Sequence, residues 1–241
     1  MSDFTAVITG GNKGIGADLA QAMLAQGWRV VSVARHAGEA RHDLLEHVHA
    51  DLMDPTATAE AAREIASCHE VTHFVHNAGV ILPNLIEDAR PEDLLALTQL
   101  HLGAALTLTQ SFLPAMRARG FGRILFNASR AALGAKTRTA YSASKAGMIG
   151  MARTWALELA ENGITVNVVA PGPVLTDNFW GIVPKGSERE ADLAHRLPVG
   201  RLGTPADVTR AFMFFAAPEA GFVTGQTLYV CGGASIGGVP I

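Results

Sequence analysis

Short apolar runs alternate with longer segments of helical periodicity along the whole chain. The apolar runs predict strands at residues 4–9, 28–34, 47–50, 71–76, 123–128, 164–170 and 227–231. Apolar positions three and four residues apart predict helices at residues 15–26, 55–67, 91–119, 141–162 and 205–217. The third of these is long enough that we expect a break or bend near its middle.

The order of these elements indicates the fold class. Strands separated by helices imply parallel pairing through right-handed crossovers. No linker, repeat or low-complexity tract divides the chain. The pattern therefore predicts a single α/β domain over residues 1–241, a doubly wound, Rossmann-type parallel sheet with helices on both faces.

Composition and charge narrow the choice of partners. Apolar residues are 49% and charged residues 17% of the 241, which argues against disorder. The net charge is −3 with no Lys/Arg run, so neither nucleic acid nor an anionic membrane is expected as a partner. No apolar run approaches the ~20 residues of a membrane span, and the first residues lack a signal-peptide pattern. We expect a cytoplasmic protein.

Cysteines and histidines give no sign of a metal or a disulfide framework. Cys68 and Cys231 are far apart, and neither belongs to a CxxC motif. His42, His47 and His49 are close in sequence but lack further candidate ligands, so ordinary polar or core roles are favoured. The sequence predicts no metal site.

The pair Tyr141 and Lys145 is the first candidate for chemistry. The apolar positions that follow predict a helix, on which residues four apart share a face with an axial offset of about 6 Å. An ammonium near a phenol lowers its pKa from about 10, which would make Tyr141 a general acid or base. Ser129 ends the preceding predicted strand and could hydrogen-bond a substrate oxygen. A lone YxxxK is weak evidence, and a surface Tyr and Lys is the alternative.

A glycine-rich loop follows the first predicted strand. It reads Thr9-Gly10-Gly11-Asn12-Lys13-Gly14-Ile15-Gly16 and opens a predicted helix. Glycines let a backbone approach a pyrophosphate, which the N–H groups and dipole of a helix N-terminus attract. An ordinary glycine-rich turn is the alternative, but the strand before and the helix after favour dinucleotide binding.

Taken together, these motifs resemble the short-chain dehydrogenase/reductase family. The TGxxxGxG motif of that family matches Thr9 to Gly16, and its NNAG appears as His76-Asn77-Ala78-Gly79. Its catalytic Ser and YxxxK fall on Ser129, Tyr141 and Lys145, and its PGxxxT falls on Pro171 to Thr176. Matches at residues 201–208 and 223–226 extend the resemblance over essentially the whole chain.

The resemblance implies an NAD(P)(H)-dependent oxidoreductase acting on a carbonyl/alcohol pair. Tyr141 would donate the proton, Lys145 would hold the nicotinamide ribose, and Ser129 would orient the carbonyl. The residues implied in cofactor binding are Gly10, Asn12, Lys13, Gly14, Ile15, Gly16, Arg35, Asp51, Leu52, Asn77, Ala78, Gly79, Tyr141, Lys145, Pro171, Gly172, Val174 and Thr176.

The residues after the second predicted strand favour NADP(H) over NAD(H). NAD-selective relatives usually carry an Asp there, and this chain has Ala34 followed by Arg35. Arg35 and Lys13 both suit a 2′-phosphate, and no carboxylate is placed to repel it. The alternative is that Arg35 simply points into solvent.

Three positions depart from the family pattern. His101 stands where the family has a proton-relay Asn, and we expect it to relay protons or hold a water, with core packing as the alternative. Ser129 and Tyr141 are 12 residues apart, where the family more often has thirteen. Cys231 stands where an Asp is usual before the final glycines.

The substrate is the least determined part of the prediction. Residues 177–200 are expected to form a substrate lid, whose aromatic and aliphatic residues favour a small apolar or cyclic substrate. A 3-oxoacyl thioester, on acyl carrier protein or CoA, is the alternative. Arg130, Lys136 and Arg138 could recognise an acidic or thioester substrate or could be solvated loop charges. A non-catalytic NADP(H)-binding regulator is the alternative of another class. The family also implies a homo-oligomer, a tetramer or dimer.

Overall fold

A seven-stranded sheet forms the centre of the computed structural model, which describes residues 3–36 and 38–236. The strands are β1 Thr5–Thr9, β2 Arg29–Ala34, β3 Leu45–His49, β4 His73–His76, β5 Gly122–Asn127, β6 Ile164–Pro171 and β7 Thr227–Val230. Their order is β3-β2-β1-β4-β5-β6-β7, and every pair is parallel. The predicted doubly wound fold is confirmed.

The order of strands places the switch point between β1 and β4. The chain runs outward from β1 to β3, returns to β4 on the other side of β1, and continues to β7. At such a point two neighbouring loops leave the sheet toward opposite faces and open a crevice at the carboxyl ends. The loops after Thr9 and His76 flank that crevice.

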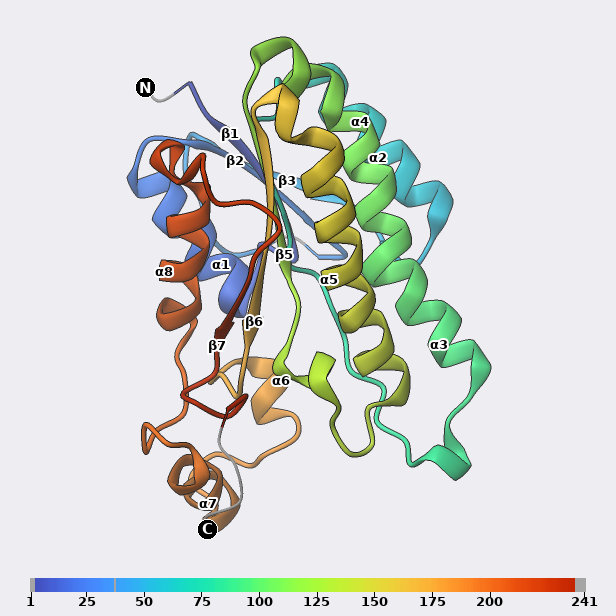
Figure 1. Cartoon of the computed structure of the whole chain (residues 1–241), viewed down its shortest axis with the longest axis vertical. Helices are drawn as coiled ribbons and strands as arrows, with labels where there is room; N and C mark the ends of the chain where they lie inside the picture. Colours follow the sequence, from blue (N-terminus) through green and yellow to red (C-terminus); the bar gives the residue numbers. More distant parts are fainter. Residues whose placement is uncertain (1–2, 37, 237–241) are drawn as a thin grey trace.

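Helices cover both faces of the sheet (Figure 1). The helices are α1 Gly14–Ala25, α2 Pro55–Cys68, α3 Pro91–Thr98, α4 Ala104–Arg119, α5 Thr139–Leu159, α6 Asp177–Trp180, α7 Glu188–Arg196 and α8 Pro205–Ala216. Helices α1 and α8 pack against one face of the sheet and form one apolar core with it. Helices α2, α4 and α5 pack against the opposite face and form a second core. The strands are buried on both faces, which explains their continuous apolar runs.

Local sequence signals explain where several helices begin and end. Asp54 accepts hydrogen bonds from the backbone N–H groups of Thr56 and Ala57 at the start of α2. Thr204 and Asp207 form a reciprocal capping box at the start of α8. Gly120 ends α4 in the left-handed conformation, φ 63°, which glycine adopts without steric cost.

The long helical region predicted at 91–119 is interrupted as expected. Between α3 and α4, residues Gln99–Gly103 form a π-helical turn that contains His101. A π-helical turn widens the helix locally and often lies at a functional site. Elsewhere the observed boundaries differ little from the predicted ones: β3 lies at Leu45–His49 rather than 47–50, and β4 begins at His73 rather than 71.

No helix in the described ranges is both long and apolar enough to span a bilayer. Over the same residues, no group of three or more His, Cys, Asp or Glu side chains could hold a metal ion.

Candidate active site

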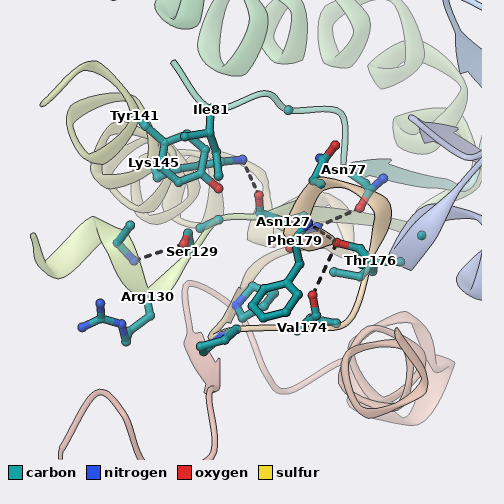
Figure 2. A pocket seen from close by; sticks show the side chains of 18 of the residues that line it. Asn77, Ile81, Asn127, Ser129, Arg130, Tyr141, Lys145, Val174, Thr176 and Phe179 are labelled. Atoms are coloured by element: carbon teal, nitrogen blue, oxygen red, sulfur yellow. Dashed lines mark hydrogen bonds between the residues drawn. The ribbon is translucent and has the colours of Figure 1, made fainter. Parts of the chain in front are cut away.

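A cavity of about 420 Å³ opens at the carboxyl ends of β1, β4, β5 and β6 (Figure 2). Most of the predicted site residues line it: Gly10, Asn12, Lys13, Gly14, Ile15, Asn77, Ala78, Gly79, Ser129, Tyr141, Lys145, Pro171, Gly172, Val174 and Thr176. Residues far apart in the sequence therefore meet in one place, as a parallel sheet requires.

The glycine loop has the close approaches of a dinucleotide cradle. Gly10 and Gly14 have φ values of +65° and +54°, in the left-handed region. A Cβ on Gly10 would lie 3.1 Å from Asn77 Nδ2, and a Cβ on Gly16 would collide with the Gly10 carbonyl. Gly16 is buried and does not line the cavity, so its contribution is to let α1 pack against the loop.

Hydrogen bonds connect this loop to Lys145 through two asparagines. Asn77 Nδ2 donates to the carbonyls of Thr9 and Gly10, at 3.0 and 3.1 Å. Asn127 Nδ2 donates to Asn77 Oδ1 at 2.7 Å, and Lys145 Nζ donates to the Asn127 carbonyl at 2.7 Å. This is the Thr9–Lys145 network, and it fixes the Lys145 amino group relative to the glycine loop.

Asn127 was missed by the sequence reasoning. Its signal is present, because it is a polar residue at the end of an otherwise apolar strand, and burying an amide is costly unless it is hydrogen-bonded. The cavity is lined further by Ile81, Ala128, Arg130, Ala131, Ala135, Lys136, Arg138, Pro173, Asp177, Asn178, Phe179 and Ile182.

Tyr141 and Lys145 share one face of α5, as the spacing predicts. Lys145 Nζ lies 5.6 Å from the centre of the Tyr141 ring. Burial, with only 2% of the residue exposed, lowers the pKa of Lys145 from 10.5 to about 7. The ammonium therefore loses its proton far more readily than a lysine in water.

The pKa of Tyr141 differs from the sequence-based expectation. Burial raises it above 10, while the Ser129 hydroxyl and the Arg138 guanidinium oppose that rise. Lys145 does not reverse this rise, since burial also disfavours its charged form. The expected net lowering of the phenol pKa by Lys145 is wrong for this structure, in which Tyr141 is a neutral phenol near pH 7.

His101 is fully buried behind Lys145 and does not line the cavity. Its Nδ1 lies 2.8 Å from Ser144 Oγ, and that hydroxyl donates its single proton to the Tyr141 carbonyl at 3.0 Å. His101 must therefore donate from Nδ1, which leaves Nε2 as an acceptor. Nε2 has no partner among the described residues, and a Cβ on Gly79 would lie 2.9 Å from it and 3.4 Å from Lys145 Nζ.

The electrostatic surroundings keep His101 neutral. Burial lowers its pKa well below the usual 6.5, and the nearby Lys145 and His76 lower it further. The expectation that His101 contributes an ionisation to the pH profile is therefore wrong. A neutral imidazole can still pass a proton, because it accepts at one nitrogen and donates at the other.

Besides Gly16, three predicted cofactor residues lie outside this cavity: Arg35, Asp51 and Leu52. Arg35 is exposed directly after β2 and has no hydrogen bond or ion pair within the described residues. Asp51 Oδ1 accepts from the Met53 backbone N–H at 3.0 Å, and Leu52 packs in the core with 4% exposure. Leu52 can therefore present only its backbone to a ligand, because its side chain is committed to packing.

The region expected to form a lid contains two short helices. Phe179 and Ile182, in and after α6, line the cavity, whereas α7 has no buried residue. Thr176, which lines the cavity, caps α6 by accepting from the Phe179 N–H at 3.4 Å.

Comparisons with known proteins agree with this geometry. Residues 10–235 match a family model described as enoyl-(acyl carrier protein) reductase. The 3-oxoacyl-[acyl-carrier-protein] reductase FabG of Escherichia coli is 33% identical over 236 residues, covering 95% of this chain and 96% of the relative. The (2S)-[(R)-hydroxy(phenyl)methyl]succinyl-CoA dehydrogenase subunit BbsD of Thauera aromatica is 35% identical over 242 residues, covering 96% of each.

Solved structures extend the agreement to three dimensions. A short-chain dehydrogenase/reductase family protein superposes with a TM-score of 0.87 at 34% identity, covering 96% of this chain and 97% of the other. A putative NAD(P)-dependent gluconate 5-dehydrogenase from Beutenbergia cavernae, with bound NADP, gives a TM-score of 0.88 at 34% identity and 97% coverage of both.

Fold, cavity and relatives define an oxidoreductase. More particularly, the chain belongs to the short-chain dehydrogenase/reductase family.

Proposed function

We propose that the protein transfers a hydride between NADP(H) and the carbonyl or secondary alcohol of a small substrate. The observation that carries the proposal is the convergence of Ser129, Tyr141 and Lys145 on the same cavity as the glycine loop. When bound, NADP(H) supplies or accepts the hydride. The residues of this chain bind the cofactor, orient the substrate and transfer the proton.

The cofactor assignment rests on the cradle and on two cations. Gly10, Gly14 and Gly16 leave room that side chains would fill, at the N-terminus of a twelve-residue helix. Lys13 lines the cavity and Arg35 is exposed without a described partner, so both are free to meet a 2′-phosphate. The bound NADP of the Beutenbergia cavernae relative supports the same choice.

The raised pKa of Tyr141 favours the reductive direction near neutral pH. A neutral phenol can donate a proton to the carbonyl oxygen, and Ser129 can hold that oxygen by donating a hydrogen bond. Oxidation of an alcohol instead requires the phenolate, which burial disfavours.

His101 fits a neutral hydrogen-bond partner for Lys145 in this proposal. The Nε2 acceptor lies on the Lys145 side, and the Nδ1 donor continues through Ser144 to the Tyr141 backbone carbonyl. We assign His101 a positioning role toward Lys145, as a hydrogen-bond acceptor at Nε2, in place of the family's Asn.

A 3-oxoacyl thioester is the second candidate substrate. It is supported by the names of two relatives, one reducing a 3-oxoacyl carrier protein and one acting on a CoA compound. The apolar lining of Ile81, Phe179 and Ile182 suits an acyl chain or a ring equally well. Homo-oligomerisation stays a prediction from the family.

The test uses NADPH oxidation with a panel of ketones, 2- and 3-oxo acids and thioesters. Tyr141→Phe should lose about 10²- to 10⁴-fold in kcat while keeping its affinity for NADPH, because the phenol acts in proton transfer. Tyr229→Phe is the matched control, since it removes the chain's other phenol, outside the cavity. Absence of turnover on the whole panel with intact NADPH binding would favour the non-catalytic regulator.

A further inference from the structure

The cavity has a strongly cationic rim that proton and hydride transfer do not use. Arg130, Lys136 and Arg138 all line it, on the segment of residues 130–138 that joins Ser129 to α5. Figure 2 shows Arg130 beside Ser129. The only carboxylate among the lining residues is Asp177, which belongs to α6.

None of these three cations forms an ion pair among the described residues. The ion pairs there join Glu46 to His69, Asp93 to Arg90, Asp192 to Arg196, and Asp207 to Arg201 and Arg210. A surface cation without a partner is ordinary, but three of them line the cavity that also holds Tyr141, which calls for a role in that cavity.

Arg138 is held in place by its neighbour. Its Nη1 donates to Thr137 Oγ1 at 2.6 Å and to the Thr137 carbonyl at 3.2 Å. That carbonyl also accepts from the Asn84 N–H at 3.1 Å, which ties the segment to the loop after β4. Nε and Nη2 of Arg138 have no partner among the described residues, so one edge of the guanidinium stays available.

The backbone beside Arg138 is strained at Thr137. Thr137 has φ 65° and is the only non-glycine residue with positive φ in the described chain. A β-branched residue in the left-handed region is strained, and such strain persists only where the surroundings enforce it. The strained turn places the Arg138 charge close enough to lower the pKa of Tyr141 against the effect of burial.

We propose that the natural substrate carries a carboxylate or phosphate besides its carbonyl, and that Arg138, with Arg130 and Lys136, binds this anion. A guanidinium edge matches the two oxygens of either group. The lining side chains of Phe179 and Ile182 would contact the apolar part of the substrate. This inference rests on the proposed function and specifies its substrate class.

Two matched pairs of probes separate the sources of the anion. Acetoacetate and ethyl acetoacetate differ in a carboxylate, whereas acetoacetyl-4′-phosphopantetheine and acetoacetyl-pantetheine differ in a phosphate. We expect one anionic member to exceed its neutral partner in kcat/KM. Arg138→Gln and Arg130→Gln should reduce that advantage about tenfold or more, mainly through KM, since a hydrogen bond to a charged group is lost.

Three further variants make the result specific. Lys136→Gln, at an exposed position that tolerates substitution, should give a smaller loss with the same anionic probe. Arg153→Gln removes an exposed cation from α5 outside the cavity and should change neither member of the pair. Arg138→Ala should lose the anionic advantage as Arg138→Gln does, with an unchanged urea midpoint; an advantage kept in Arg138→Ala would count against the proposal.

Equal kcat/KM within both pairs, unchanged by the Arg138 and Arg130 variants, would overturn the inference. Calorimetric titration of acetoacetate and of CoA into the protein with NADP⁺ keeps the two proposals apart. Anion binding that is lost in Arg138→Gln, without reduction of any probe, would support the anion site and reject the reductase. Reduction of only the neutral probes would support the reductase and reject the anion site.

Discussion

Lys145→Met should abolish turnover and yet stabilise the protein near neutral pH. The folded protein holds the Lys145 pKa at about 7, against 10.5 in the unfolded chain, because the ammonium is almost fully buried. One pH unit of pKa difference corresponds to about 1.4 kcal/mol, so the charged form is destabilised by roughly 5 kcal/mol below pH 7. Loss of the hydrogen bond to the Asn127 carbonyl offsets about 1–3 kcal/mol of that gain.

The sign of the pH dependence follows from proton binding. Between pH 7 and pH 10.5 the unfolded chain binds more protons at Lys145 than the folded protein, so wild-type stability rises with pH in that window. From pH 6 to pH 9 the wild type should gain about 2–3 kcal/mol relative to Lys145→Met.

Urea unfolding of both proteins at several pH values measures this difference. Comparing each with Lys185→Met, which removes an exposed lysine from the lid region, controls for the loss of any lysine. A wild-type stability that runs parallel to that of Lys145→Met from pH 6 to pH 9 would refute the argument that burial sets the Lys145 pKa.

Three further predictions test the rest of the site. Arg35→Ser should lower the preference for NADPH over NADH by about tenfold or more, because it removes a charge-assisted contact. The control Arg29→Ser, at the other end of β2, should leave the preference unchanged. An unchanged ratio of kcat/KM for NADPH to kcat/KM for NADH in Arg35→Ser would leave Arg35 a solvated side chain. His101→Leu should depress kcat severalfold while His101→Asn largely preserves it, and the wild-type pH profile should contain no ionisation of His101; equal rates for His101→Leu and wild type would leave a packing residue. The rate of alcohol oxidation should rise with pH above neutrality as the Tyr141 phenolate forms, and a flat profile in stopped-flow measurements of the chemical step would contradict the raised pKa.

The sequence predicted the fold and the framework of the site because both depend on local patterns. Buried parallel strands must be apolar on both faces, so runs such as residues 164–170 were visible without any structure. The glycines after β1 and the four-residue spacing of Tyr141 and Lys145 carry their geometry in the sequence itself.

What the sequence did not predict depends on burial and on long-range contacts. The pKa values of Tyr141, Lys145 and His101 are set by how deeply each lies, which no spacing reveals. The role of Asn127 requires β5 to lie next to β4, so that its amide reaches Asn77 across 50 residues of sequence. The strained Thr137 follows from the tie to Asn84, another contact between distant segments.

The Thr9–Lys145 network separates the molecule into parts that can change independently. The glycine loop, Asn77, Asn127 and Lys145 are joined by main-chain and amide hydrogen bonds, so a substitution in any of them should affect the others. Residues 130–138 and the region of α6 and α7 have no member in that network. An experimenter who wishes to redirect this enzyme to another substrate should therefore begin with the region of α6 and α7, and should keep the Arg138 charge, which acts on Tyr141, when exchanging residues 130–138.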